Sequence, residues 1–129
     1  MTLAGAQVPA RLAPSLAALE DEMWSINDPE LLDLCRIRLG QLMGRDLPAR
    51  AAGPDKVGAL RRWPSDPAFS EAERAVLDFC ELYAIDAGAI TDAHTERLHD
   101  HFDEPALAAL TMGIAVYDAL VRVANAQES

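Results

Sequence analysis

Nearly every segment of this sequence repeats apolar residues at the spacing of an α-helix, and none alternates convincingly with the two-residue period of a strand. Local signals also mark where helices begin and end. Asp28 suits an N-cap, Pro29 suits the first helical turn, and Gly44 permits the left-handed conformation that ends a helix. The sequence therefore predicts an all-α fold.

The same signals divide the chain into about six helices. Ser70 and Glu73 have the spacing of a capping box, Gly88 interrupts the helix that follows, and Thr91 and Asp103 suit N-caps. The length of 129 residues predicts a single domain, a helical bundle. The expected helices cover about residues 15–26, 29–43, 54–62, 71–87, 91–102 and 104–126.

Two segments lack a clear helical pattern. In residues 45–53, Pro48 fits either the opening of a new helical turn or a loop. Residues 1–12 are expected to be loosely ordered, as chain termini commonly are.

The last expected helix, residues 104–126, is apolar on nearly all sides. Its apolar residues include Leu107, Ile114 and Val121, which do not lie on a single narrow stripe. A helix of this kind in a small protein needs cover on more than one side, and self-association is the simplest way to provide it. The sequence therefore predicts a homo-oligomer.

Composition excludes several classes of partner. The formal net charge of −10 would repel a phosphate backbone or an anionic membrane, so neither nucleic-acid binding nor membrane binding is expected. The N-terminus lacks the pattern of a signal peptide, and no stretch of about 18 apolar residues predicts a membrane span. Cys35 and Cys80 lie in apolar helical patterns and are expected to be buried, reduced thiols. These features together predict a cytoplasmic protein.

Several stretches resemble the carboxymuconolactone decarboxylase / alkylhydroperoxidase D-like (AhpD-like) family. The run Arg38-Leu-Gly-Gln-Leu-Met-Gly44 is similar to the family's Arg-Val-Ser-Gln-Leu-Asn-Gly. Residues 60–77 resemble its Trp-containing connector, and residues 91–102 and 109–122 resemble its closing helices. The similar region covers roughly residues 28–125. The resemblance implies an AhpD-type helical bundle that assembles into trimers, or hexamers made of trimers, with sites near subunit boundaries.

The redox motif of that family is missing here. In the family, the glycine at this helix end is usually followed by Cys-x-x-Cys and, four residues later, by a His. Those three positions hold Arg45, Pro48 and Ala52 in this sequence. Disulfide exchange needs a thiolate nucleophile and a second thiol to resolve it. The resemblance therefore implies a member without thiol redox chemistry, in which Asp33 matches the family's activating Glu.

Asp33 and Arg45 are the candidate catalytic residues. Asp33 would act as a general base or hydrogen-bond acceptor. Arg45, which the resemblance places beside the active cavity, would bind a substrate carboxylate. Arg38, Gln41 and Arg122 are candidate substrate-binding residues, and Arg122 matches an Arg of the family's last helix. The structural alternatives are ion pairs on the helix surface, a solvated charge at the helix end, and polar contacts between subunits.

The remaining patterns favour structural roles. His94, His99 and His101 share one expected helix, but not at the four-residue spacing that presents two histidines to one metal, so we expect neither a metal site nor a cofactor. Gly40 suits a place where another helix approaches closely. Asp118 lies one turn before Arg122, and this pair is expected to be buried or at an interface.

Two classes of function remain open. One is a non-redox decarboxylase or lyase that acts on a small carboxylate or lactone near Asp33 and Arg45. The other is a non-catalytic oligomeric scaffold or small-molecule-binding protein. An alkylhydroperoxidase-type peroxidase is disfavoured by the missing thiols. A closed apolar pocket that raises the pKa of Asp33 would favour the enzyme, and a solvent-open Asp33 paired with Arg36 would favour the scaffold.

Overall fold

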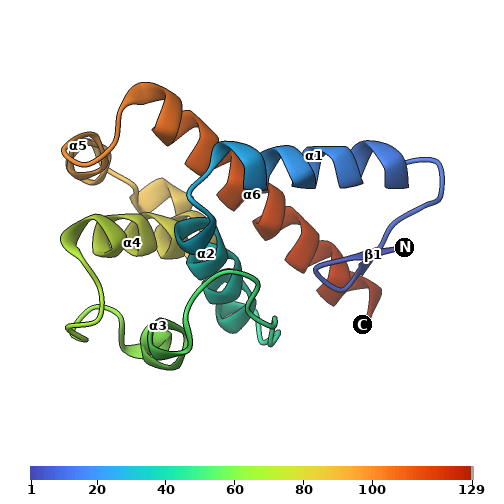
Figure 1. Cartoon of the computed structure of the whole chain (residues 1–129), viewed down its shortest axis with the longest axis horizontal. Coiled ribbons are helices and arrows are strands. Elements are labelled where there is room, and N and C mark those ends of the chain that lie inside the picture. Colours follow the sequence, from blue (N-terminus) through green and yellow to red (C-terminus); the bar gives the residue numbers. More distant parts are fainter. Residues whose placement is uncertain (129) are drawn as a thin grey trace.

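The computed structural model describes residues 1–128, which form an all-α bundle with one very small two-stranded sheet (Figure 1). The predicted all-α fold is confirmed, and the described residues contain six α-helices. The α-helices are α1 (Ala13–Ile26), α2 (Pro29–Leu42), α3 (Pro54–Ala59), α4 (Glu71–Ile85), α5 (Asp92–His99) and α6 (Glu104–Gln127), and the shorter elements are β1 (Thr2–Leu3), β2 (Ala6–Gln7), η1 (Leu60–Arg62) and η2 (Ala87–Ala89).

Local capping places most helix ends close to where the sequence predicts them. The Asp28 side chain accepts hydrogen bonds from two backbone N–H groups in the first turn of α2. Gly44, just beyond the end of α2, has a φ of +75°. Ser70 and Glu73 form the expected capping box at the start of α4. Each of these contacts joins residues close in sequence, which is why the sequence alone reveals them.

α2 is the central helix, packed against both α4 and α6 (Figure 1). One apolar cluster joins α2 to α4 and α6, and a second joins it to α3 and η1. With both sides covered, any charged side chain on the inner surface of α2 must find a partner inside the protein. Asp33 and Arg36 are the two buried charged residues of this helix, and their contacts define the site described below.

The N-terminal segment corrects one expectation. We expected residues 1–12 to be loose, but β1 and β2 form an antiparallel hairpin that packs on the end of α6 (Figure 1). Ala4 and Gly5 form the turn with φ angles of 49° and 86°, as a tight hairpin requires. Leu3 is buried, and Gln7 exchanges two hydrogen bonds with the side chain of Gln127. The hairpin is ordered by contacts with the far end of the chain, which the local sequence does not reveal.

The segment after α2 is a loop, which settles the ambiguity of residues 45–53. The loop turns back sharply over α2, and the Arg45 N–H donates a hydrogen bond of 2.7 Å to the Gly40 carbonyl. A Cβ on Gly40 would lie 2.5 Å from the Arg45 carbonyl oxygen. The close approach predicted at Gly40 therefore exists, but it accommodates this loop instead of another helix.

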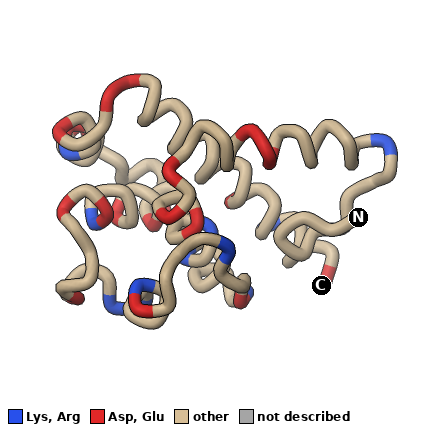
Figure 2. Tube along the Cα trace, viewed as in Figure 1, with Lys and Arg blue, Asp and Glu red and all other residues tan. Residues whose placement is uncertain are grey.

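α6 is the longest helix of the described residues and the most apolar. Charged residues are sparse along it (Figure 2). By length and composition, with a mean hydropathy of 1.6, it meets the criteria for a membrane span, which the sequence analysis did not anticipate. Of that apolar window, 44% is buried inside the protein. One helix of this kind is weak evidence for a membrane span, because core helices of soluble proteins meet the same criteria.

Candidate ligand-binding site

A cleft of about 350 Å³ lies between the N-terminal hairpin, α1, α2, the loop after α2 and α6. Besides Thr2 of the hairpin, four polar side chains line it, each from a different segment. Glu20 comes from α1, Arg36 from α2, Arg50 from the loop and Tyr117 from α6. The cleft is therefore a product of the tertiary fold.

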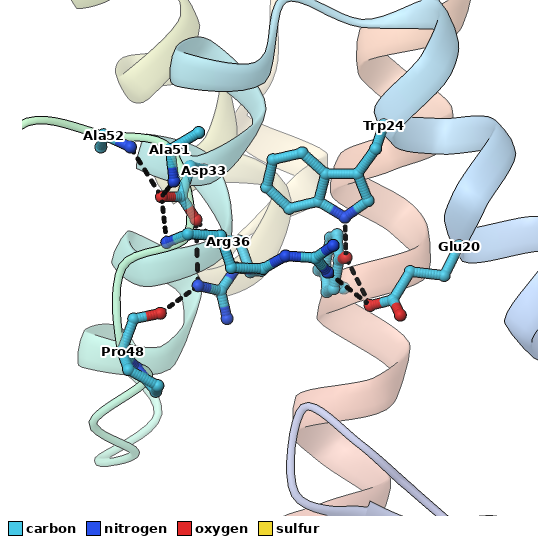
Figure 3. Close-up of polar contacts among 9 residues, drawn as sticks. Glu20, Trp24, Asp33, Arg36, Pro48, Ala51 and Ala52 are labelled. Carbon is cyan, nitrogen blue, oxygen red and sulfur yellow. Dashed lines mark hydrogen bonds and ion pairs between the residues drawn. The ribbon is translucent and has the colours of Figure 1, made fainter.

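Asp33 anchors the loop that forms one wall of the cleft (Figure 3). Its Oδ2 accepts hydrogen bonds of 2.8, 2.7 and 2.9 Å from the backbone N–H groups of Arg50, Ala51 and Ala52. Its Oδ1 accepts from Nε of Arg36 at 3.0 Å and pairs with Nη2 at 2.9 Å. The carboxylate is fully buried, and five N–H groups surround it.

These donors decide the charge of Asp33. Burial by itself would raise the pKa of the carboxyl group, but the three backbone N–H groups and the Arg36 guanidinium together hold the pKa below its ordinary value of 3.8. Asp33 is therefore an ionised anchor whose oxygens already have partners. This matches neither arrangement considered from the sequence, since Asp33 is paired with Arg36 but is closed off from solvent.

Arg36 is held rigidly at the edge of the cleft. Besides the two contacts with Asp33, its Nη2 donates to the carbonyl oxygen of Pro48 (Figure 3). These contacts use Nε and Nη2, so Nη1 is the guanidinium nitrogen available to a ligand. The ring of Tyr117 lies 6.0 Å from the guanidinium carbon.

A second polar network closes the opposite wall of the cleft. Trp24 Nε1 donates a hydrogen bond of 2.7 Å to the Tyr117 hydroxyl, which donates one of 2.6 Å to Glu20 Oε2. Arg50 Nη1 lies 3.5 Å from the same Glu20 oxygen, and the Arg50 guanidinium stacks 4.2 Å from the centre of the Trp24 ring. Glu20 and Trp24 approach from α1 one helical turn apart (Figure 3).

The environment of Tyr117 keeps its hydroxyl protonated. Burial raises the pKa of this phenol, and the hydrogen bond to Glu20 raises it further. A protonated hydroxyl beside a carboxylate is a proton donor that can be reloaded from its neighbour. The cleft thus combines two guanidinium groups for an anion with one held proton.

The other residues selected from the sequence lie outside this cleft. Arg45 pairs with Glu128 and packs against the hairpin turn at Gly5. Arg38 bonds Gln41 and pairs at 2.7 Å with Glu81. These contacts hold α2, α4 and the two chain ends together.

Arg122 is placed at the junction of α6 and α4. It donates to Asp118 at 2.9 Å and to the carbonyl oxygen of Ala84. Of the five predicted site residues, only Asp33 belongs to the polar network of the cleft. A direct role for Arg45, Arg38, Gln41 or Arg122 in substrate binding stays a prediction that this geometry does not support.

Sequence reasoning did not identify the residues of the second polar network as site residues. Glu20 and Trp24 are spaced one helical turn apart, and Tyr117 is a polar-tipped residue in an apolar helix, so weak signals existed for these three. Arg50 carried no signal, because its position depends on how the loop folds around Asp33.

The two cysteines meet inside the protein, where α2 packs on α4. Both are free and fully buried, as predicted, and Cys80 Sγ lies 3.9 Å from the carbonyl oxygen of Cys35. The hydrogen bond to the Cys35 side chain and burial raise the pKa of the Cys80 thiol well above its ordinary value. A buried thiol with a raised pKa is a poor nucleophile. Within residues 1–128, no cluster of three or more His, Cys, Asp or Glu residues has the arrangement of a metal site.

Comparison with known proteins supports the fold. No family model matches the sequence. The uncharacterised protein YnjA of Escherichia coli is 33% identical over 79 residues, which are 61% of this chain and 43% of YnjA. The chain therefore matches less than half of the length of that relative.

A solved structure from Agrobacterium tumefaciens extends the comparison to nearly the whole chain. That protein is described as of unknown function and as a candidate antioxidant defence protein, AhpD. It superposes with a TM-score of 0.76 at 21% identity, over 94% of this chain and 90% of the other. The expected AhpD-like fold is thereby confirmed, and the two cysteines do not form a Cys-x-x-Cys pair.

Proposed function

We propose that this AhpD-like protein is a carboxymuconolactone decarboxylase-like protein without thiol redox chemistry, and that it acts on a small carboxylate or lactone bound in the cleft. The observation that carries the proposal is the arrangement of Arg36. Asp33 and the Pro48 carbonyl orient its guanidinium, and a protonated Tyr117 hydroxyl lies on the facing wall. A fixed guanidinium is suited to bind a carboxylate.

The missing redox motif supports the non-redox part of the proposal. Arg45, Pro48 and Ala52 occupy the positions that the resemblance assigns to two cysteines and a histidine. The backbone of Ala52 instead donates to Asp33, and the Pro48 carbonyl accepts from Arg36. The segment that carries redox chemistry in the family is thus used here to build the wall of a binding cleft.

The chemistry would require only groups already in the cleft. Arg36 and Arg50 would hold a carboxylate of the substrate. In a decarboxylation, the bond from carbon to the departing carboxylate breaks, carbon dioxide leaves, and the electron pair remains on carbon. The Tyr117 hydroxyl would donate its proton to that carbon, and water would restore the proton through Glu20.

A non-catalytic binding protein is the second candidate. The observation that favours it is that Asp33, the carboxylate proposed from sequence as a base, has a lowered pKa and bonds to five N–H groups. Catalysis would then depend on Tyr117 and Glu20 alone. Binding and turnover must therefore be measured separately.

The test uses calorimetric titration with a panel of small carboxylates, including succinate, cis,cis-muconate and a γ-lactone carboxylate. Arg50→Gln should weaken binding about tenfold or more, because it removes a charge-assisted contact. Arg62→Gln is the matched control, since the Arg62 side chain is 66% exposed and lies outside the cleft. No binding by the wild type, or equal binding by Arg50→Gln and the wild type, would reject the proposed site.

Tyr117→Phe separates the two candidate functions. If the protein is an enzyme, this variant should bind the carboxylate but lose turnover. Turnover is measured as release of carbon dioxide or as loss of the lactone. For a binding protein, neither the wild type nor the variant turns over any ligand that it binds.

A further inference from the structure

Each positive charge that lines the cleft already has a counter-ion within the protein. Arg36 pairs with Asp33 at 2.9 Å, and Arg50 Nη1 lies 3.5 Å from Oε2 of Glu20. The two carboxylates lie on opposite sides of the cleft (Figure 3). Among the described residues that line it, no guanidinium is without a carboxylate. The cleft therefore offers cationic hydrogen-bond donors but no net positive charge.

The remainder of the cleft wall is hydrocarbon. Outside the polar network, the described side chains that line the cleft are apolar apart from Thr2, and the largest are Leu3 of the hairpin and Leu47 of the loop. The volume of about 350 Å³ has room for about ten non-hydrogen atoms, at the roughly 30 Å³ that a water molecule occupies in the liquid. A small ligand whose carboxylate reaches the guanidinium groups thus places the rest of its chain against apolar side chains.

We infer that the cleft selects a ligand with a single carboxylate and a short apolar chain, and that Glu20 disfavours a second carboxylate. This selectivity rests on the proposed function, because it specifies the substrate class of the same site. Nη1 of Arg36 and the Arg50 guanidinium bind the one carboxylate. A second carboxylate would lose its water beside Leu3 and Leu47 without gaining a partner, or would be repelled by Glu20. The net charge of −10 also opposes a dianion more strongly than a monoanion.

Glu20 is the counter-ion whose charge can be removed without dismantling the cleft. Asp33 cannot serve for this purpose, because its carboxylate is fully buried and anchors the loop. The Glu20 side chain is 15% exposed, and its Oε2 accepts a hydrogen bond from the Tyr117 hydroxyl. Glutamine retains an oxygen that can accept this bond but has no charge. Glu20→Gln therefore leaves Arg50 without its counter-ion and gives the cleft a net positive charge.

Calorimetric titration with hexanoate and adipate tests the selectivity. The two ligands have chains of equal length and differ only in whether the far end is a methyl group or a carboxylate. The wild type should bind hexanoate more tightly than adipate, by about tenfold or more. In Glu20→Gln, the ratio of the two dissociation constants should fall by about fivefold or more, because the uncompensated Arg50 attracts the second charge of adipate. Glu22→Gln is the matched control, since it removes the same charge from an exposed site of α1 outside the cleft. Its ratio should equal that of the wild type.

A series of shorter monocarboxylates tests the apolar part of the cleft. From hexanoate through pentanoate to butyrate, each CH₂ group removed should weaken binding by about two- to fourfold, because less apolar surface is buried. Equal affinities along the series would show that the chain lies in solvent and would overturn the assignment of an apolar chain.

Failure of this inference and failure of the proposed function give different results. Adipate binding as tightly as hexanoate, or an unchanged ratio in Glu20→Gln, would overturn the selectivity but leave a carboxylate site in place. No binding of either ligand by the wild type, or full hexanoate affinity in Arg50→Gln, would reject the proposed function and the selectivity with it. The comparison of the two ligands on the wild type is independent of how well the Glu20→Gln variant folds, and circular dichroism shows whether that variant retains its helices.

Discussion

Among single residues, Asp33 has the most demanding environment. It is fully buried, pairs with the buried Arg36, and fixes three consecutive backbone N–H groups of the loop after α2. Removing its charge would leave the Arg36 guanidinium buried without a counter-ion. Removing one partner of a buried ion pair lowers the free energy of unfolding by several kcal/mol. Removing an exposed carboxylate has a much smaller effect on stability.

We predict that Asp33→Asn lowers the free energy of unfolding by about 3 kcal/mol at pH 7. The exposed Asp46→Asn in the same loop is the control and should change stability by less than about 0.5 kcal/mol. Urea unfolding monitored by circular dichroism measures both. Similar stabilities for the wild type and Asp33→Asn would contradict the anchoring role.

The pH dependence of the same pair of proteins follows from the lowered pKa of Asp33. A carboxyl group whose pKa is lower in the folded protein contributes stability above its unfolded pKa of 3.8, and this contribution is lost as the pH falls through the folded value. The stability difference between wild type and Asp33→Asn should therefore be constant near neutral pH and should shrink below about pH 4.

The residues of the site also show what the sequence can and cannot predict. Asp33 was selected through a family resemblance, but its anchoring role could not be predicted. The backbone N–H groups that bond to it come from a loop 17 to 19 residues away in the sequence. Tyr117 and Glu20 are 97 residues apart in sequence, and only the packing of α1 on α6 joins them. Arg45 was expected near the cavity, yet its partner Glu128 comes from the far end of the chain.

Among the elements, the helices were predictable because their ends depend on neighbours in sequence, such as Asp28 for α2 and Ser70 for α4. The N-terminal hairpin was not predictable, because contacts with α6 hold it in place. The path of the loop after α2 was not predictable either, because it depends on the absence of a side chain at Gly40. Elements stabilised by distant contacts form the walls of the cleft, so the site was less predictable than the fold.

The loop's dependence on Gly40 can be tested by substitution. A Cβ on Gly40 would lie 2.5 Å from the Arg45 carbonyl oxygen and 3.1 Å from Leu47 Cγ, so backbone would have to move. Gly40→Ala should lower the unfolding free energy by about 1–3 kcal/mol, the usual cost of overpacking. Gly58→Ala in α3 is the matched control, since no atom lies within 4 Å of its added Cβ. The control should be about 0.5–1 kcal/mol more stable than the wild type, because alanine favours helix.

Urea titration of the two glycine variants gives the comparison directly. Opposite signs of the stability change are expected. Equal stabilisation of both variants would show that the loop does not pack closely on α2.

For the whole molecule, the AhpD-like fold follows from the ordered set of helices, whereas the predicted homo-oligomer would depend on surface that the single chain leaves uncovered. The resemblance implies a trimer or a hexamer, which stays a prediction.

The last prediction concerns how salt affects the association of two acidic molecules. Each copy has a net charge of −10, so bringing two together through an apolar face is opposed by long-range repulsion. The screening length falls from about 30 Å at 10 mM salt to about 8 Å at 150 mM. Any exposed ion pair between two subunits would weaken in salt by less than about 1 kcal/mol. Relief of the repulsion should dominate.

Raising sodium chloride from 10 to 300 mM should therefore tighten self-association, by about tenfold in the dissociation constant, or 1.4 kcal/mol. Sedimentation velocity over a concentration series measures the change. Met112→Glu should weaken the predicted self-association at every salt concentration, because Met112 is an exposed large apolar residue of α6 and a carboxylate there would oppose burial against another copy. If salt instead dissociates the wild-type assembly, its subunits are joined mainly by ion pairs, and the apolar surface of α6 is not the contact that holds them.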